Sequence, residues 1–178
     1  MHVNTRGNNR ARLYFDGIDY AAWLRILSRA VERFEWRCHA YCLMPNHFHL
    51  LLELTEATLA AGMRHLNGSY AQRINTRYDR TGHVFEGPYS ADLVESDEHF
   101  LAASRYIVLN PVRAGLCVDP ADWPWSSFRA TAGLEHRPPY LVVDFTRAMF
   151  GNDSRAGAAA YHEFVAAGAM AHDLVVRQ

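Results

Sequence analysis

A hairpin of two strands is the feature that most constrains the fold of this chain. Residues 36–44 and 47–54 are apolar runs of strand length, and Pro45-Asn46 between them is typical of a tight turn. Successive side chains of a strand point to opposite faces, so His47 and His49 share one face. The other face is apolar and points into a core: Phe48, Leu50, Leu52 and Leu54. Two imidazoles side by side can hold a divalent metal, although a strand His pair is more often only exposed or hydrogen-bonded.

A predicted helix further along the chain carries a second pair of polar side chains. Ser96 is a good N-cap for a helix that runs from about residue 97 to about residue 109. Pro111 disfavours helical geometry in the residue before it, so we expect the helix to stop there. Tyr106 and Asn110 are four residues apart and therefore share a face near the end of this helix.

The order of the predicted elements indicates an α+β fold. The pattern is β-α-β-β-α-β followed by the tyrosine helix, which is typical of a ferredoxin-like antiparallel sheet. The expected segments are strand 2–6, helix 18–34, strands 36–44 and 47–54, helix 58–78, a strand within 81–94 and helix 97–109. Both crossover helices would cover one face of the sheet. The open face would carry the two histidines, with the tyrosine helix packed against it.

Composition favours one globular domain. The chain has 178 residues, 49% of them hydrophobic, and no apolar run approaches the ~20 residues of a membrane span. Cys38 and Cys42 lie on one predicted strand, too far apart to bridge, and with Cys117 they form no zinc pattern. The start of the chain lies almost inside the first strand and lacks the apolar segment of a signal peptide. A reduced, cytoplasmic protein is therefore expected.

Four sequence blocks together resemble a known family. They are Thr5-Arg-Gly-Asn-Asn-Arg10, His47-Phe-His49, the tyrosine block from Arg105 to Leu116, and Asp122-Trp-Pro-Trp-Ser-Ser127. In this order they resemble the HUH single-tyrosine transposases, most closely the REP-associated tyrosine transposases of bacteria. The resemblance covers residues 1–130, expected to be the catalytic domain. Residues 131–178 are expected to be a helical C-terminal extension of the same domain.

The resemblance implies a role for each candidate residue. It implies that His47 and His49 hold a divalent cation, Mg2+ or Mn2+, and that Asn110 completes the site. It implies that Tyr106 attacks a phosphodiester of single-stranded DNA, giving a 5′-phosphotyrosyl link and a free 3′-hydroxyl. Insertion-sequence relatives often have glutamine in place of Asn110, which is one methylene shorter, so a helix-capping role for Asn110 is nearly as well supported as ligation.

Elementary chemistry explains why such a reaction needs these residue types. A cation on a non-bridging oxygen neutralises the phosphodiester charge that repels a nucleophile. A tyrosine of ordinary pKa, about 10, is mostly neutral at pH 7 and loses its proton more easily beside a cation. Imidazole ligands suit Mn2+ better than Mg2+. Four further tyrosines compete as nucleophiles, but none combines a polar residue at i+4 with an adjacent arginine as Tyr106 does: Tyr70, Tyr78, Tyr89 and Tyr161.

The charge of the chain argues against DNA binding overall but not in its first half. The formal net charge is −1, whereas DNA-binding proteins are usually basic. All 18 basic residues are arginines; residues 1–80 hold 11 of them against seven acidic residues, and the remainder holds seven against 12. Arginine forks onto phosphate and stacks on bases. Arg6 and Arg10 are the stronger DNA-binding candidates, whereas a solvated helix face explains Arg73 and Arg77 slightly better than DNA contact does.

The expected function is a metal-dependent single-stranded DNA endonuclease and strand-transferase acting on hairpin repeat elements. A monomer is expected, with a dimer as the alternative. One rival function is a domesticated protein that binds DNA hairpins without cutting them, which would fit the missing basic residues at Pro88-Tyr-Ser90. The other is a metal-dependent phosphodiesterase that uses water in place of Tyr106. Rolling-circle replication proteins and conjugative relaxases share the chemistry, but the tyrosine block resembles the transposases more.

Overall fold

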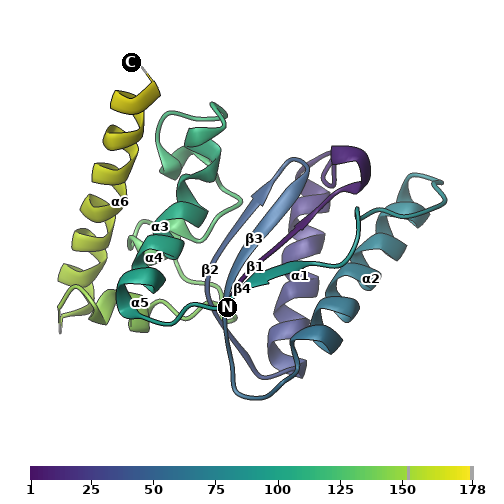
Figure 1. The fold of residues 1–178 in the computed structure, drawn as a ribbon, viewed down its shortest axis with the longest axis horizontal. Helices are drawn as coiled ribbons and strands as arrows, with labels where there is room; N and C mark the ends of the chain where they lie inside the picture. The colour runs from purple at the N-terminus through teal and green to yellow at the C-terminus, as the bar shows by residue number, and fades with distance from the viewer. Residues whose placement is uncertain (152, 177–178) are drawn as a thin grey trace.

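A four-stranded antiparallel sheet separates two layers of helices in the computed structural model, which describes residues 1–151 and 153–176 (Figure 1). The strands are β1 (His2–Arg6), β2 (Trp36–Met44), β3 (His47–Leu54) and β4 (Ser90–Asp92), in the spatial order β2-β3-β1-β4. Every neighbouring pair is antiparallel. This is the predicted ferredoxin-like arrangement, in which the two central strands come from the two halves of the motif.

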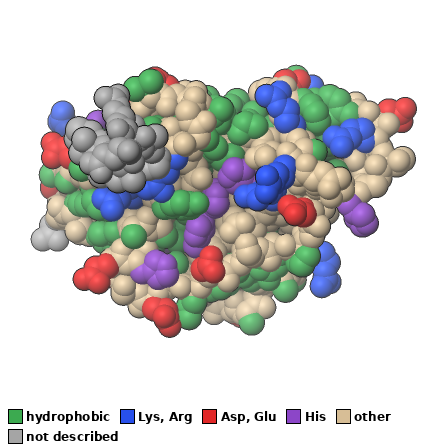
Figure 2. All heavy atoms as spheres, turned by 45° about the horizontal axis from the view of Figure 1, so that its top comes forward, with side chains coloured by type: hydrophobic (Ala, Val, Ile, Leu, Met, Phe, Trp, Pro, Cys, Tyr) green, Lys and Arg blue, Asp and Glu red, His purple; other side chains and the backbone are tan. Residues whose placement is uncertain are grey.

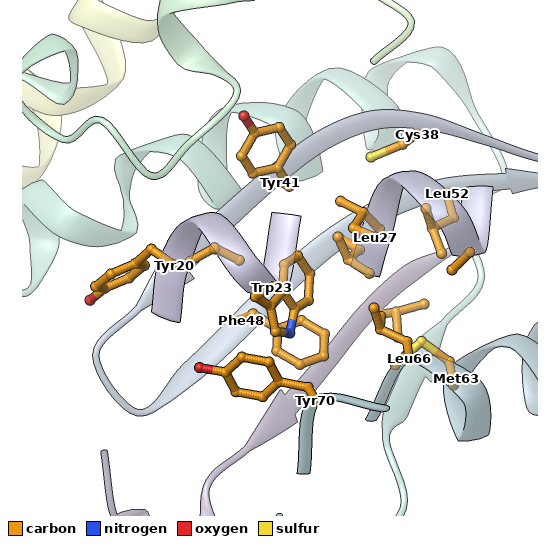
Figure 3. Packing of buried hydrophobic residues seen from close by; sticks show 14 of the residues in the cluster. Tyr20, Trp23, Leu27, Cys38, Tyr41, Phe48, Leu52, Met63, Leu66 and Tyr70 are labelled. Carbon is orange, nitrogen blue, oxygen red and sulfur yellow. The ribbon is translucent and has the colours of Figure 1, made fainter. Parts of the chain in front are cut away.

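Two long helices, α1 (Gly17–Arg33) and α2 (Leu59–Arg77), cover one face of this sheet. The chain enters α1 through Asp16, whose carboxylate caps the helix by accepting hydrogen bonds from the N–H groups of Ile18 and Asp19. Beneath both helices lies the larger core (Figure 3), which includes Val3, Trp23, Leu27, Phe48, Leu50, Leu52, Leu66 and Tyr70. The predicted inward residues of β3 therefore do pack in the core, except Leu54, which is only partly buried.

The other face of the sheet is covered by α3 (Asp97–Arg113), the tyrosine helix. A second cluster joins it to β2 and β3, formed by Ala40, Cys42, Met44, Leu51, Phe100, Ala103 and Ile107. The far side of α3 packs against α6 (Ser154–Val176) through a third cluster that contains Val108, Leu109, Phe128, Tyr161 and Val165. Figure 1 shows α3 between the sheet and α6.

Short elements complete the chain around these helices. They are the 3₁₀ turns η1 (Asn8–Arg10) and η2 (Pro120–Asp122) and the helices α4 (Phe128–Thr131) and α5 (Asp144–Ala148). The predicted helical extension, residues 131–178, is therefore helical in α5 and α6, whereas residues 132–143 form turns and irregular chain. Residues 152, 177 and 178 lie outside the described residues. None of the helices in the described part of the chain is both long enough and apolar enough to cross a bilayer.

One predicted helix boundary is wrong. The tyrosine helix does not stop before Pro111 but continues to Arg113 with the proline inside it. A proline has no N–H to bond the carbonyl four residues earlier, here that of Ile107. The side-chain amide of Asn110 donates to this carbonyl at 3.4 Å and to that of Tyr106 at 2.9 Å. Asn110 therefore compensates for the missing donor, and it is not the C-cap, a position taken by Ala114.

Both tryptophans of the Trp-Pro-Trp segment are partly buried and pack against the rest of the protein. Trp125 stacks on Tyr20, with ring centroids 4.5 Å apart and planes inclined by 10°. Trp123 donates its indole N–H to the carbonyl of Leu43 at 3.0 Å. Both tryptophans also contact the larger core. The segment therefore fastens the region after α3 onto β2 and α1.

Candidate active site

The two histidines and the tyrosine meet on the open face of the sheet. His47 and His49 project from β3 with ring centroids 5.1 Å apart. The helix α3 brings the Tyr106 ring edge-on to His49, 5.7 Å between centroids. Tyr106 nevertheless remains 39% exposed. Figure 2 shows histidine side chains gathered in a strip along a hollow of this surface, with arginine beside them.

A hydrogen bond to Asn46 fixes the orientation of His47. The Nδ1 atom of His47 lies 2.7 Å from Oδ1 of Asn46. Nδ2 of Asn46 donates in turn to the carbonyl of Arg10 at 3.2 Å, so its Oδ1 is the atom that faces the imidazole. Because a carboxamide oxygen only accepts, Nδ1 of His47 carries the proton and Nε2 keeps its lone pair. Burial, and then the charge of Arg6, lower the pKa of His47 to about 4, so the ring is neutral at pH 7.

His49 is the more buried of the pair and has a third histidine as its partner. Its Nδ1 lies 3.0 Å from Nε2 of His2 on the neighbouring strand β1. Burial first, and then the charges of His47, His2 and Arg6, lower the pKa of His49 to about 3. Burial also lowers the pKa of His2, against the opposing charge of Asp92. All three imidazoles are therefore neutral at pH 7, the form that can ligate a metal.

Two further side chains of α3 border the tyrosine. Arg113 places its guanidinium carbon 5.1 Å from the centroid of the Tyr106 ring, a cation–π contact. Asn110 is one helical turn after Tyr106 and is tied to it through the hydrogen bond from its amide. That bond uses the nitrogen of Asn110, so its oxygen remains available as a ligand. Arg105, in contrast, turns away from the site and stacks on Phe164 of α6 at 4.3 Å.

The chemistry of the donor set fits a divalent metal. A metal–imidazole bond is about 2.1 Å long, so two rings with centroids 5.1 Å apart can reach one ion. Both rings are neutral, and a carboxamide lies on the helix that faces them. Among the side chains that the structure describes, those of residues 1–151 and 153–169, no group of three or more His, Cys, Asp or Glu is placed to hold a metal. A site here would therefore need Asn110 or the substrate itself as a further ligand.

The competing tyrosines have other roles in the fold. Tyr70 and Tyr161 are fully buried; Tyr70 donates to the carbonyl of Leu13 at 2.7 Å, and the Tyr161 hydroxyl pairs with Ser104 at 3.2 Å. Tyr78 donates to Asp19 at 2.8 Å. The remaining candidate, Tyr89, is half-buried beside α2 in a cavity of about 620 Å³. Of the five, Tyr106 is the one that both contacts the His pair and remains exposed.

The four arginines proposed to bind DNA lie in two places. Arg6 and Arg10 are exposed, and Arg6 stands directly opposite His47 in the β1–β3 ladder. Arg6 also lines a polar depression of about 270 Å³ together with Asn4, Glu86 and Ser90. Arg77, on the opposite layer of the molecule, forms ion pairs with Asp16 and Asp19, and Arg73 lies one turn before it on α2. DNA contact by any of the four stays a prediction.

Residues 1–110 match the model of a protein family described as IS200-like transposases. The chain belongs to this family. The match includes every strand of the sheet, both histidines, Tyr106 and Asn110, so the predicted family resemblance is confirmed.

Two individual relatives of this family member are informative. A protein of Haemophilus influenzae named as a REP-associated tyrosine transposase is 25% identical over 118 residues, which are 60% of this chain and 67% of that protein. A solved structure of a REP-associated tyrosine transposase bound to a REP hairpin is similar with a TM-score of 0.66 and 16% identity. It covers 79% of this chain and 83% of the solved one. At that identity the likeness confirms the fold alone.

The sequence pattern did not single out His2 and Arg113. His2, Asn4 and Arg6 alternate along β1, so they share a face, and a ferredoxin-like sheet places β1 beside β3. These two facts together were a signal that His2 lies beside the strand that carries His47 and His49. Arg113 was not predicted to lie beside Tyr106, because the helix was expected to end before residue 113. The register that brings His2 to His49 depends on pairings that one sequence does not reveal.

Proposed function

We propose that this IS200-like family member is a metal-dependent single-stranded DNA endonuclease and strand-transferase that works through a 5′-phosphotyrosine link. The observation that carries the proposal is the contact of the exposed Tyr106 with His49, which is itself paired with His47. A structural tyrosine would be expected to bury its ring and satisfy its hydroxyl, as Tyr70 does. Tyr106 does not bury its ring in this way.

Each side chain would have a definite part in the cleavage step. The phenolic oxygen of Tyr106 attacks phosphorus and forms the new O–P bond while the bond to the 3′ oxygen breaks. The phenolic proton passes to solvent, and the departing 3′ oxygen takes up a proton to become a hydroxyl. The guanidinium of Arg113, over the ring, would favour the negative charge that grows on the attacking oxygen. Attack of a 3′-hydroxyl on the same link reverses the step and transfers the strand.

A divalent ion would be held by His47, His49 and Asn110. When bound, it would neutralise a non-bridging phosphate oxygen and orient the phosphodiester. The hydrogen bond from His47 to Asn46 presents one free imidazole nitrogen to that ion. The nitrogen ligands predict that Mn2+ supports the reaction at least as well as Mg2+.

DNA hairpins of repeat elements are the substrate class that we propose. The support is the bound REP hairpin in a solved transposase of the same fold. In this chain, Arg6 and Arg10 are exposed on the edge of the site nearest His47 and can contact phosphates. The nucleophile and the His pair come from one chain, so we further propose that the protein acts as a monomer.

A denaturing-gel assay tests this function. Labelled single-stranded hairpins would be incubated with the protein in Mn2+, Mg2+ or chelator, and cleavage and covalent adduct measured together. We expect a metal-dependent adduct that is lost in Tyr106→Phe and in His47→Ala/His49→Ala. Tyr89→Phe is the matched control and should leave the adduct unchanged. Cleavage that survives Tyr106→Phe would favour a water-dependent phosphodiesterase, and tight binding without any cleavage would favour a hairpin-binding protein.

A further inference from the structure

A third imidazole borders the candidate site and belongs to neither the nucleophile nor the predicted ligands. His2 is half-buried on β1, on the same open face as His49. Its Nε2 lies 3.0 Å from Nδ1 of His49, and the two rings are 5.2 Å apart. Its other neighbour is Tyr106, with ring centroids 5.8 Å apart at an interplanar angle of 67°. His2 therefore touches both halves of the site.

The short nitrogen–nitrogen contact has only two arrangements of protons when both rings are neutral. In one, His49 donates from Nδ1 and keeps a lone pair on Nε2. In the other, His2 donates from Nε2, and the proton of His49 then sits on its Nε2. Only the first arrangement leaves His49 able to ligate a metal through the nitrogen that faces away from His2. The proton of one hydrogen bond thus decides whether the site has one imidazole ligand or two.

His47, on the same strand, shows how a hydrogen-bond partner can keep the proton on Nδ1 and leave Nε2 free. Its Nδ1 faces the oxygen of Asn46, which can only accept, so its tautomer is fixed. His49 has no carboxamide or carbonyl at its Nδ1, and His2 occupies that position. Metal-binding histidines in general need such a partner to orient the ring and to fix the tautomer.

We propose that His2 is a positioning residue whose Nε2 accepts the Nδ1–H of His49, which keeps Nε2 of His49 free to bind the metal ion. The inference rests on the proposed function and adds to it the residue that sets the ligand state of His49. His2 itself is not a ligand in this account, because its Nε2 is occupied by the hydrogen bond. Its contact with the edge of Tyr106 lets the same ring limit the movement of the nucleophile.

The tautomer of His49 can be measured without any metal. At pH 8, above the ordinary histidine pKa of about 6.5, nitrogen NMR of the ¹⁵N-histidine-labelled full chain distinguishes protonated Nδ1 from protonated Nε2. We expect the proton of His49 on Nδ1. A proton on Nε2 would overturn the inference, whatever the metal affinity is.

Three variants extend the test to metal binding, measured by calorimetry with Mn2+ alone. His2→Leu removes the acceptor and should weaken Mn2+ binding about 10–100-fold, the usual effect of losing an orienting partner. His2→Gln supplies an accepting oxygen near the position of Nε2 and should restore most of the affinity and the Nδ1–H tautomer. His136→Gln is the matched control because His136 is exposed in a distant loop.

The remaining outcomes separate this inference from the proposed function. Equal losses in His2→Leu and His2→Gln would show that His2 only fills space, and an unchanged affinity in His2→Leu would show that it does nothing for the metal. Either result overturns the inference while the adduct assay on the unaltered protein can still succeed. If the unaltered protein binds no Mn2+ and forms no adduct, the proposed function fails, and the NMR result alone then decides whether His2 accepts from His49.

Discussion

At Gly62 the absence of a side chain lets a helix reach the core. The first turn of α2 lies against the ring of Trp36, and a Cβ on Gly62 would collide with the ring atom Cζ2. The ring has little freedom to move aside, because its N–H donates to the hydroxyl of Thr58 at 3.1 Å. The close approach of the first turn of α2 to Trp36 at the start of β2 therefore requires glycine at position 62.

Two alanine substitutions in the same helix should therefore have opposite effects. Gly62→Ala should destabilise the protein by about 1–3 kcal/mol because it overpacks the Trp36 ring. Gly68→Ala meets nothing within 4 Å and should stabilise by up to about 1 kcal/mol through helix propensity. Urea unfolding measures both. Equal effects at the two positions would contradict the packing described here.

Among the helices, α3 contains Pro111 in its interior, where a proline normally costs stability because a backbone hydrogen bond is lost. The amide of Asn110 donates to the two carbonyls around the gap that Pro111 leaves. These hydrogen bonds use the side-chain nitrogen of Asn110, whereas the proposed metal ligation would use its oxygen. The two roles can therefore be separated by experiment.

A double-mutant cycle tests the structural duty. Asn110→Ala should cost about 1 kcal/mol of unfolding free energy, the net value of a typical hydrogen bond. In a Pro111→Ala background, where the backbone donor is restored, the same substitution should cost much less. If Asn110→Ala lowers the free energy of unfolding equally in both backgrounds, the Asn110 amide does not compensate for the N–H that Pro111 lacks.

The crossover helices are joined by a buried carboxylate. Asp19 of α1 is fully buried and accepts hydrogen bonds from the N–H of Phe15 at 2.9 Å, the hydroxyl of Tyr78 at 2.8 Å and the guanidinium of Arg77. Arg77 also pairs with Asp16 at 2.7 Å, so it bridges the start of α1 and the end of α2. Any effect of Arg77 on DNA binding must be separated from this structural role.

We predict that Asp19→Ala lowers the free energy of unfolding by about 3 kcal/mol, because three donors lose their buried, charged acceptor at once. Glu32→Ala, at an exposed position of the same helix, is the control and should stay within about 0.5 kcal/mol. Chemical denaturation of both variants makes the comparison. A small effect of Asp19→Ala would mean that the helix pair is held by packing alone.

For the whole molecule, the alternation of His47 and His49 and the apolar patterns agreed with the fold of the resembled family, and together they predicted the sheet, the crossover helices and the face that carries the site. The periodicity alone would have fitted other α+β folds as well. The end of α3 was not predictable from Pro111, because the compensating donor is a side chain and not a backbone group. The role of His2 was not predicted either, because it requires the β1–β3 register. The sequence blocks shared with the family identified Tyr106 as the candidate nucleophile. The structure adds the side chains that contact it, those of His2, His49 and Arg113.

The distribution of charge over the molecule makes a further prediction. Although the net charge is −1, hairpin binding through arginine–phosphate contacts should weaken at least about tenfold between 50 and 200 mM salt. Arg6→Gln should reduce the slope of log affinity against log salt by about one. Fluorescence anisotropy with a labelled hairpin measures both quantities. Affinity that does not change with salt would exclude phosphate contacts as the main source of binding.

The central claim is that Tyr106 is the residue that becomes joined to DNA. The protein would be reacted with a single-stranded repeat hairpin in Mn2+, the DNA trimmed by nuclease, and the modified peptide identified by mass spectrometry. We expect one modified peptide, with a nucleotide 5′-phosphate on the oxygen of Tyr106. A covalent nucleotide on any other tyrosine, or cleavage of the hairpin with no modified peptide, would contradict it.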